Sequence, residues 1–573
     1  MKKIVPLLSI IVFSFSCYHP AKKISGQEHL TSFHQISKLF ADPPARFRPV
    51  PFWVWNGEMT RKDAAEQLCD LKSKGFGGVM VHPRYGMITE YLSDDWFSLV
   101  KYSSGIADSL GMSLWLYDEN SYPSGFAGGH VPDRMPESWN EGHALKMSRV
   151  ASLNMKENRN CKHIFTRKDG KFHEITGDLP SFIGKRGDYY LFEPVYYPRS
   201  PWYAGFSYVD LLRKGVTEKF IEVTMDGYKS SAGHYFGSVI PGIFTDEPHI
   251  SPQGGQAYIR WTPDLYDVFL QRNGYDLRPE LPGLVSKTGN WKKTRHDYYA
   301  TLLDMFIDRW AKPWYEYTTR ENLVWTGHYW EHEWPYPRQG PDNMAMYAWH
   351  QMPGIDMLFN YHDNNRSQFG NIRSVKELSG IANQLGRHRT LSETYGGSGW
   401  ELTFGDMKRN GDWEYVLGVN FMNQHLTFQT LAGDRKHDYP PSFSCHEPWW
   451  NLYKEQNDYF ARLSLCLSSG EQMNPVLVIE PTTTAWMYYE PGNENPELET
   501  MRKTFHEFLS FLEKHQVEYD LGSEHVISLH GSVNNRLFTV GNRHYSLVIL
   551  PPMLENLESR IAGLLIQYVE NGG

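Results

Sequence analysis

The feature that most constrains the fold is a series of eight short apolar runs, separated by helical patterns and each followed by polar residues. The runs lie at 51–56, 77–83, 113–120, 242–248, 322–330, 354–362, 389–397 and 417–425. They lack the alternation of polar and apolar residues that marks a strand with one wet face, which is typical of parallel strands covered on both sides. Strand and helix patterns that repeat in this way predict a (β/α)8 barrel.

Two regions interrupt the regular alternation of strands and helices. About 120 residues separate the third run from the fourth, and the β-like stretch "YYLFEPVYYP" predicts an inserted β subdomain at about 131–207 within a barrel over 48–465. After residue 470 the pattern changes, and 471–573 are predicted to form a small open α/β domain. The sequence stops directly after a helical pattern, so we expect this last domain to be truncated.

The N-terminus has the pattern of an export signal. Lys2 and Lys3 precede an apolar stretch that is too short to span a bilayer, and Cys17 follows it. We predict a lipoprotein signal at 1–17 with Cys17 lipidated, followed by a tether over 18–47. This places the protein in the cell envelope of a Gram-negative bacterium, in the periplasm or on the outer membrane, with membrane contact only through the lipid. Ordinary cleavage, which would give a soluble exported protein, is the alternative.

The composition narrows the class of partner. The net charge is −9, so no excess of basic residues indicates nucleic-acid binding. Aromatic residues reach 15%, which fits either a large aromatic core or a carbohydrate cleft in which rings stack on sugars. The other four cysteines are too scattered for a disulfide framework and lack the spacing of a metal site.

Polar residues at the ends of the runs indicate where the site lies, because the carboxyl ends of barrel strands form the active-site face. Asn360, His362 and His425 follow the later runs. The predicted substrate-binding residues are Trp55, Asn56, His82, Asp118, Glu119, Asn120, Asp246, His328, Trp400 and Asn423. A single polar residue at a strand end is easily explained as the N-cap of the helix that follows, but a whole set of such residues is not.

Two glutamates stand at the ends of the fourth and seventh runs. In a barrel, Glu247 and Glu393 would face each other across a bound sugar. Glycoside hydrolysis requires such a pair, one protonated acid and one carboxylate that acts as base or nucleophile. Like-charge repulsion from Asp246 or Glu119 would raise the pKa of the acid. An oligo- or polysaccharide is therefore the predicted partner.

The chain resembles glycoside hydrolase family 106, the α-L-rhamnosidases, and related uncharacterised glycosyl hydrolases. The resemblance rests on "FWVWNGEMT", "GGVMVHPRYG", "LWLYDENSYPSGFAGG", "IFTDEP" and "SETYGGSGWELTFGDMKRNGDWEYVLGVN". It implies a barrel enzyme that removes terminal α-L-rhamnose from pectic or other plant glycans with inversion. It further implies Glu247 as the acid, Glu393 as the base and a Ca²⁺ ion near the sugar hydroxyls.

Several alternatives remain open. "HYWEH" at 328–332 matches a zinc-peptidase pattern that works only on a helix, but here it follows a strand, so we instead predict Glu331 and Glu333 as oxygen ligands of a hard cation. The positions of the two glutamates also suit a retaining enzyme of the β-galactosidase-like clan, with Glu393 as nucleophile. A non-catalytic carbohydrate-binding lipoprotein is the third alternative.

Overall fold

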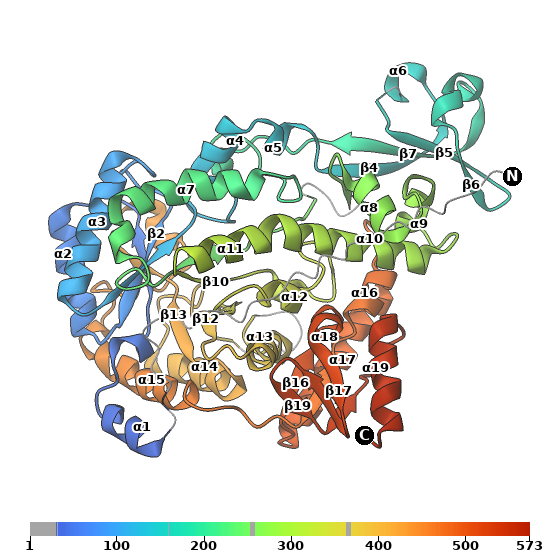
Figure 1. Ribbon diagram of the computed structural model, residues 1–573. Helices are drawn as coiled ribbons and strands as arrows, with labels where there is room; N and C mark the ends of the chain where they lie inside the picture. Colours follow the sequence, from blue (N-terminus) through green and yellow to red (C-terminus); the bar gives the residue numbers. More distant parts are fainter. Residues whose placement is uncertain (1–29, 31, 159, 253–257, 362–367) are drawn as a thin grey trace, which may run out of the picture.

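The computed structural model describes residues 30, 32–158, 160–252, 258–361 and 368–573 (Figure 1). The predicted signal with Cys17, and His362 after the sixth run, lie outside the described residues. Among the described helices, none combines the length and the apolar character needed to cross a membrane.

Each of the eight apolar runs contains one parallel strand. The strands are β1 Phe52–Trp55, β2 Gly78–Pro83, β3 Ser113–Tyr117, β8 Gly242–Asp246, β10 Val324–His328, β11 Gly354–Met357, β12 Leu391–Thr394 and β13 Phe421–Gln424. They pair in two sheets, one in the order β10-β8-β3-β2-β1-β14 and the other in the order β11-β12-β13, where β14 is Thr427–Phe428. Backbone hydrogen bonds link the sheets at both junctions. One runs from Met352 N to Trp325 O at 3.1 Å, and another from Val50 N to Met422 O at 3.0 Å.

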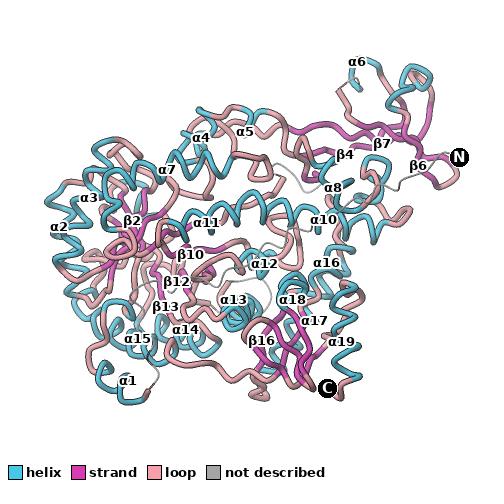
Figure 2. Tube along the Cα trace, in the orientation of Figure 1, coloured by secondary structure: helices cyan, strands magenta, loops and turns pink. Residues whose placement is uncertain are grey.

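Helices lie between consecutive strands and cover their outer side (Figure 2). The longer ones are α2 Arg61–Ser73, α3 Asp94–Ser109, α7 Val216–Ala232, α10 Trp291–Phe306, α11 Lys312–Arg320, α13 Ile372–Leu385, α14 Phe404–Leu417 and α15 Tyr453–Leu467. Local sequence explains where several begin. The Ser93 side chain accepts a hydrogen bond from Trp96 N at the start of α3, and Thr403 and Asp406 form a capping box on α14.

The strands divide their side chains between two cores. Phe52 and Val54 of β1 belong to a cluster that gathers side chains from both sheets, whereas Trp53 and Trp55 belong to the larger cluster shared with the helices. Because successive strand residues point to opposite faces, the first cluster fills the space enclosed by the strands. Its strand residues are Phe52, Val54, Met80, Trp115, Tyr117, Phe244, Val324, Leu391, Phe421 and Phe428.

An antiparallel sheet projects from this body (Figure 1, upper right). Its strands are β4 Ala144–Ser152, β5 His163–Lys168, β6 Lys171–Glu174, β7 Arg186–Val195 and β9 Tyr258–Arg260, in the order β6-β5-β7-β4-β9. The first four lie within the predicted insertion. β9 follows β8 instead, so the sheet has two sequence origins, both at the carboxyl ends of barrel strands.

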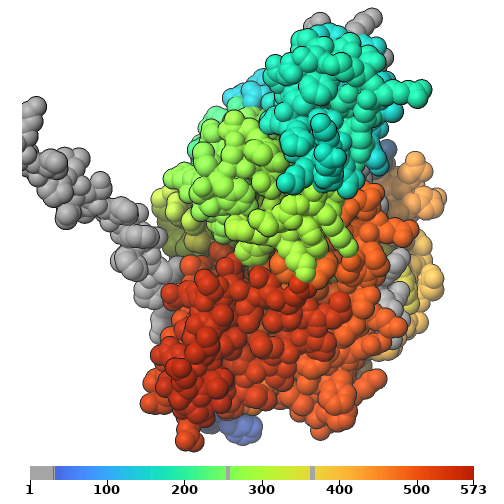
Figure 3. Space-filling view, turned by 90° about the vertical axis from the view of Figure 1, so that its right-hand side faces the viewer, coloured from blue at the N-terminus to red at the C-terminus, as the bar shows by residue number. Residues whose placement is uncertain are grey.

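The C-terminal region has its own small parallel sheet, in the order β16-β15-β20. Its strands are β15 Val476–Ile479, β16 Tyr519–Gly522 and β20 Leu547–Ile549, and its helices are α16 Thr482–Tyr488, α17 Pro496–Lys514, α18 Glu524–His530 and α19 Ser559–Glu570. A second, antiparallel sheet joins β17 Gly531–Asn534, β18 Leu537–Val540 and β19 Arg543–Tyr545, which the sequence patterns did not predict. Figure 3 shows this region below the projecting sheet.

Residues 33–47 differ from the predicted tether. Phe33–Phe40 form α1, whose capping box joins Ser32 and Gln35, and Ala45–Phe47 form a 3-10 turn. Leu30 and Phe47 pack with Leu465 of α15. Between them, apolar residues recur at helical spacing in α1 and give the helix a face that packs against the same cluster.

Candidate active site

Four inward-facing polar side chains occupy one level at the carboxyl ends of neighbouring strands. His328 ends β10 and is in register with Asp246, which ends β8. Asp356 of β11 is in register with Glu393 of β12. All four are at least nine-tenths buried, so three carboxyl groups and one imidazole share a confined space.

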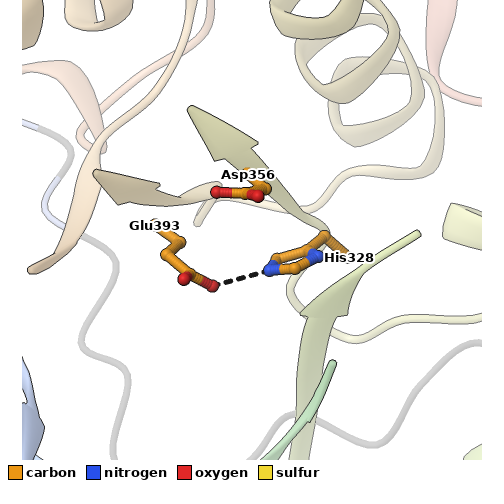
Figure 4. A group of neighbouring side chains, drawn as sticks. All are labelled: His328, Asp356 and Glu393. Atoms are coloured by element: carbon orange, nitrogen blue, oxygen red, sulfur yellow. Dashed lines mark hydrogen bonds and ion pairs between the residues drawn. The ribbon is translucent and has the colours of Figure 1, made fainter. Parts of the chain in front are cut away.

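His328 and Glu393 form an ion pair. Nε2 of His328 lies 2.7 Å from Oε2 of Glu393 (Figure 4). The same nitrogen lies 3.9 Å from Oδ1 of Asp246. Burial alone would lower the pKa of His328, but the hydrogen bond and the charge of Glu393 raise it well above its usual value. Burial raises the pKa of Glu393, and His328 opposes this rise. The contact therefore favours the charged form of both partners against the effect of burial.

Asp356 is the third member of this group and was not predicted. Its Oδ2 accepts a hydrogen bond from Gln368 Nε2 at 2.8 Å, while its buried Oδ1 has no hydrogen-bond partner among the described residues. Burial, followed by the charge of Glu393, raises its pKa well above the usual value. β11 ends at Met357, three residues before the predicted strand-end residue Asn360, so Asp356 is the acid that this strand carries.

Glu247 lies one residue beyond the end of β8 in a left-handed conformation, with φ +44°. Its backbone carbonyl accepts a hydrogen bond from Trp330 Nε1 at 3.2 Å, but no described residue hydrogen-bonds its carboxyl group. Burial, then the charge of Asp246, raises the pKa of Glu247 well above the usual value. Glu331 and Glu393 act in the same direction and His328 opposes them, so the surroundings of Glu247 on balance favour its protonated form.

A second set of contacts supports Asp246. The Tyr117 hydroxyl donates a hydrogen bond to Asp246 Oδ2, and the Tyr117 ring stacks on His82 with centroids 3.8 Å apart. His82 Nε2 lies 3.2 Å from Nη1 of Arg84, which donates two further hydrogen bonds to Asp438, at 2.8 and 2.9 Å. Burial lowers the pKa of His82, and Arg84 lowers it further, so this imidazole is neutral.

The sequence patterns did not predict four residues of this site: Arg84, Tyr117, Asp356 and Asp438. Two of them could have been found, because Arg84 directly follows His82-Pro83 and Asp356 is an acid inside an apolar run. Asp438 had none, because it lies in a loop far from any predicted strand and meets Arg84 only in the folded chain.

Three predicted substrate-binding residues serve the scaffold instead. Trp55 is fully buried beside Trp53 and Trp96, on the helix side of β1. Asn56 pairs its amide with the backbone of Thr430, at 3.0 and 3.1 Å. Asn423 donates a hydrogen bond to Val50 O at 2.8 Å and so links β13 to the segment before β1. The sequence showed that these residues end strands, but not which face they occupy.

Glu119 organises a loop. It is fully buried, and its carboxyl oxygens accept hydrogen bonds from the backbone N–H groups of Asn120, Gly125, Phe126, Ala127 and Gly128. Asn120 itself is half-buried in that loop. The prediction of Glu119 as a substrate ligand is therefore wrong, because its lone pairs are used by the chain.

Asp118 and Trp400 lie elsewhere around the carboxyl ends of the barrel strands. Asp118 Oδ1 accepts a hydrogen bond from Ser124 Oγ at 2.6 Å, and Ser124 Oγ in turn accepts one from Asp246 N at 2.8 Å, so this pair connects the loop to β8. Trp400 follows β12 and is 37% exposed, which leaves its ring free to contact a ligand.

Glu331 and Glu333 do not converge on a cation. Glu331 accepts hydrogen bonds from Asp356 N and, at 3.1 Å, from the Tyr347 hydroxyl, so both of its carboxyl oxygens are engaged. Glu333 pairs with Arg338 at 2.7 Å. Oxygen atoms committed to protein donors are unsuited to calcium, which takes six to eight oxygen ligands. His328, Asp356 and Glu393 do bring potential ligand atoms within 4.8 Å of one another, but two of these atoms form the ion pair described above.

Comparison with known proteins gives a family and a fold. The model of glycoside hydrolase family 106, described as alpha-L-rhamnosidase, matches residues 196–573. Among solved structures, a rhamnosidase from Novosphingobium sp. PP1Y is 15% identical, with a TM-score of 0.67 over 93% of this chain and 69% of that one. No curated protein sequence gives a significant match.

Two β-galactosidases are also similar in structure. The enzyme from Rahnella sp. R3 is 12% identical, with a TM-score of 0.55 over 92% of this chain and 70% of that one. A catalytic mutant of a GH42 β-galactosidase from G. stearothermophilus is 12% identical, with a TM-score of 0.54 over the same shares. At these identities the likeness shows the fold alone, which is the TIM-barrel-like, mixed α/β fold of glycoside hydrolases.

Proposed function

The chain belongs to glycoside hydrolase family 106, the alpha-L-rhamnosidases, and from this premise we propose that it removes terminal α-L-rhamnose with Glu247 as acid and Glu393 as base. One observation carries the assignment of roles. The Glu247 carboxyl group has no hydrogen-bonded partner among the described residues and its pKa is raised well above the usual value, whereas the Glu393 carboxyl group pairs with His328, which opposes the rise of its pKa. Acid–base glycoside hydrolysis requires two carboxyl groups whose surroundings differ in this way.

The proposed step balances within the site. A water molecule attacks the anomeric carbon and passes a proton to Glu393. The glycosidic C–O bond breaks, and its electron pair goes to the leaving oxygen, which takes the proton of Glu247. Solvent exchange then returns both carboxyl groups to their starting states. His328 keeps Glu393 ionised between turnovers, since its positive charge favours the carboxylate.

For the stereochemical course we propose inversion, which the family membership supports. The retaining alternative would make Glu393 a nucleophile, and the contact with His328 is compatible with either role. An aryl α-L-rhamnoside followed by NMR decides between them, because inversion releases β-L-rhamnose first and retention releases the α-anomer.

For the substrate we propose pectic or other plant-type glycans with terminal rhamnose. Exposed aromatic rings near the mouth support a carbohydrate ligand: Trp400 is 37% exposed, and Trp202, whose Nε1 donates to Tyr122 O, is 43% exposed. A panel of aryl glycosides tests this proposal. Binding of rhamnosides without release of the aryl group would favour the non-catalytic carbohydrate-binding alternative.

For the layout we propose one eight-stranded barrel over 48–465, closed through the β10–β11 and β13–β1 junctions, with a separate α/β domain over 471–573. We further propose that Cys17 carries a lipid that anchors the enzyme in the envelope of a Gram-negative bacterium. The lysines and the apolar stretch before Cys17 support this proposal.

A further inference from the structure

The projecting sheet is basic although the chain as a whole is acidic. Residues 144–195, from the start of β4 to the end of β7, contain ten Lys and Arg against six Asp and Glu, a net charge of +4. The whole chain carries −9, so the remaining residues carry −13. A local reversal of sign of this size favours contact with an anionic partner at this part of the surface.

Arginine and aromatic side chains form a row across one face of this sheet. The Arg167 guanidinium carbon of β5 lies 5.7 Å from the Phe172 ring centroid of β6, and the Phe172 ring meets Tyr190 of β7 edge to face at 4.7 Å. Arg149 of β4 covers Tyr190 at 5.4 Å. Arg149 is in register with Tyr190, and Arg167 with Phe172, so four strands supply one continuous row.

Both arginines and the Phe172 ring are accessible to a ligand, whereas Tyr190 is buried beneath Arg149. The Arg149 side chain is 61% exposed, Arg167 is exposed, and Phe172 is half-buried. Asp188 accepts hydrogen bonds from Arg149 and holds the guanidinium in place, and the only other acid on this face of the described strands, Glu174, pairs with His163. Asp188 occupies the Nε and Nη2 edge of Arg149, so Nη1 of Arg149 and the Arg167 guanidinium beside Phe172 are the groups placed to meet an anionic sugar. The exposed basic residues nearby are Lys168, Lys171, Lys185 and Arg186.

The sheet is joined to the active-site face. The chain enters the sheet after β3 and goes back to the barrel after β7, through α7 to β8. It enters the sheet a second time at β9, which follows Glu247 and the carboxyl end of β8 (Figure 1). At its base, Arg199 lies 5.6 Å from the Trp139 ring and 5.8 Å from the Phe206 ring. Arg149 lies five residues from Ala144, the first residue of β4, which is roughly 17 Å at the rise of an extended strand.

We propose that this face binds an acidic polysaccharide, a glycan whose sugars carry carboxylate or sulfate groups, and holds the polymer whose ends the active site trims. The proposal rests on the proposed function, because it takes the ligand of the face to be the polymeric form of the enzyme's own substrate. Charge and stacking together favour a charged glycan, since ring contacts suit sugars and the guanidinium edges suit their anionic groups.

The test compares binding and turnover in the full chain. Removing both guanidinium groups (Arg149→Gln with Arg167→Gln) should weaken binding to polygalacturonate about tenfold at low ionic strength, with the loss shrinking as salt is added. Lys62→Gln with Lys503→Gln is the matched control, because both lysines are exposed on barrel and C-terminal helices and the charge change is equal. An Arg149→Lys, Arg167→Lys variant keeps the charge but loses the planar fork, so it should recover only part of the affinity.

Four binding probes give distinct outcomes. Polygalacturonate and dextran sulfate separate carboxylated from sulfated glycans, and tighter binding of either than of a neutral galactan supports the proposal. Equal loss in the lysine control, or binding of single-stranded DNA as tight as that of both acidic glycans, would overturn it. Hydrolysis of an aryl α-L-rhamnoside should be the same in all variants. Absence of that hydrolysis in the unmodified chain would refute the proposed function, whereas intact hydrolysis without glycan binding would refute only this inference.

Discussion

His328 Nε2 lies 2.7 Å from Glu393 Oε2, which makes the last residue of β10 the ionic partner of a carboxylate two strands away. Both side chains are nearly fully buried, so water screens their attraction very little. The pair leaves Glu247 as the only one of the two predicted catalytic acids without a counter-charge in hydrogen-bond contact among the described residues. This asymmetry is the physical basis of the predictions below.

Replacing the proposed acid should slow catalysis most for poor leaving groups. Glu247→Gln removes the proton that the leaving oxygen needs, and we expect about a 10²- to 10⁴-fold loss of kcat on natural rhamnosides. Aryl rhamnosides with very acidic phenols should lose far less. Glu66→Gln on the exposed face of α2 is the control. Equal losses on both substrate types would argue against Glu247 as the acid.

Replacing the proposed base should abolish turnover without rescue. In Glu393→Ala nothing activates the attacking water, so activity should fall to background on every rhamnoside. Added azide should not restore it, because an inverting enzyme has no nucleophile to replace. Formation of a glycosyl azide of inverted configuration, detected by NMR, would identify Glu393 as a nucleophile and establish retention.

Removing the imidazolium should move the acidic limb of the pH–rate profile. His328→Gln takes away the positive charge that opposes the rise of the Glu393 pKa, so Glu393 should lose its proton only at higher pH. We expect the acidic limb of kcat/KM to rise by about 1–3 pH units. His515→Gln, at the exposed end of α17, should leave the profile unchanged. A uniform loss of kcat with an unmoved limb would show that His328 has only a structural role.

One buried acid should make the protein less stable as pH rises. Burial raises the pKa of Glu414 in α14 to about 8, opposed by the Ser392 hydroxyl, whereas an unfolded chain titrates near 4.3. Its stabilising effect is complete below about pH 4 and is lost as pH rises toward 8, with a cost on the order of 3 kcal/mol at pH 7. Glu414→Gln should therefore raise Tm at pH 8 more than at pH 5. Parallel Tm curves for the two proteins would contradict this assignment.

Lipid anchoring is tested in cells. Cys17→Ala removes the thiol that would carry the lipid, so we expect the protein to move from the membrane fraction to the soluble fraction of the envelope. Ser16→Ala is a suitable control because it leaves the thiol in place. Unchanged membrane association of the Cys17 variant would rule out this anchor.

The strands and the family could be predicted from the order of residues alone, and that order also singled out the two glutamates as the proposed acid and base. Eight apolar runs without alternation are typical of strands buried on both faces, and each run contains a strand in the structure. The resemblance to family 106 is confirmed by the family match. Glu247 and Glu393 stood out because an acid at the end of a buried run is costly unless it has a function.

Which polar residues lie together at the carboxyl ends of the strands became clear from the folded chain. A strand end in sequence does not show which way its side chain points, and a shift of one residue reverses the face, so Trp55 turned out to join the helix core while His328 and Asp356 point inward. The partners of Glu119 and Arg84 also lay beyond prediction. The loop that closes on Glu119 and the distant Asp438 that pairs with Arg84 come together only when the chain folds, and hydrogen bonds depend on positions in space rather than on spacing in sequence.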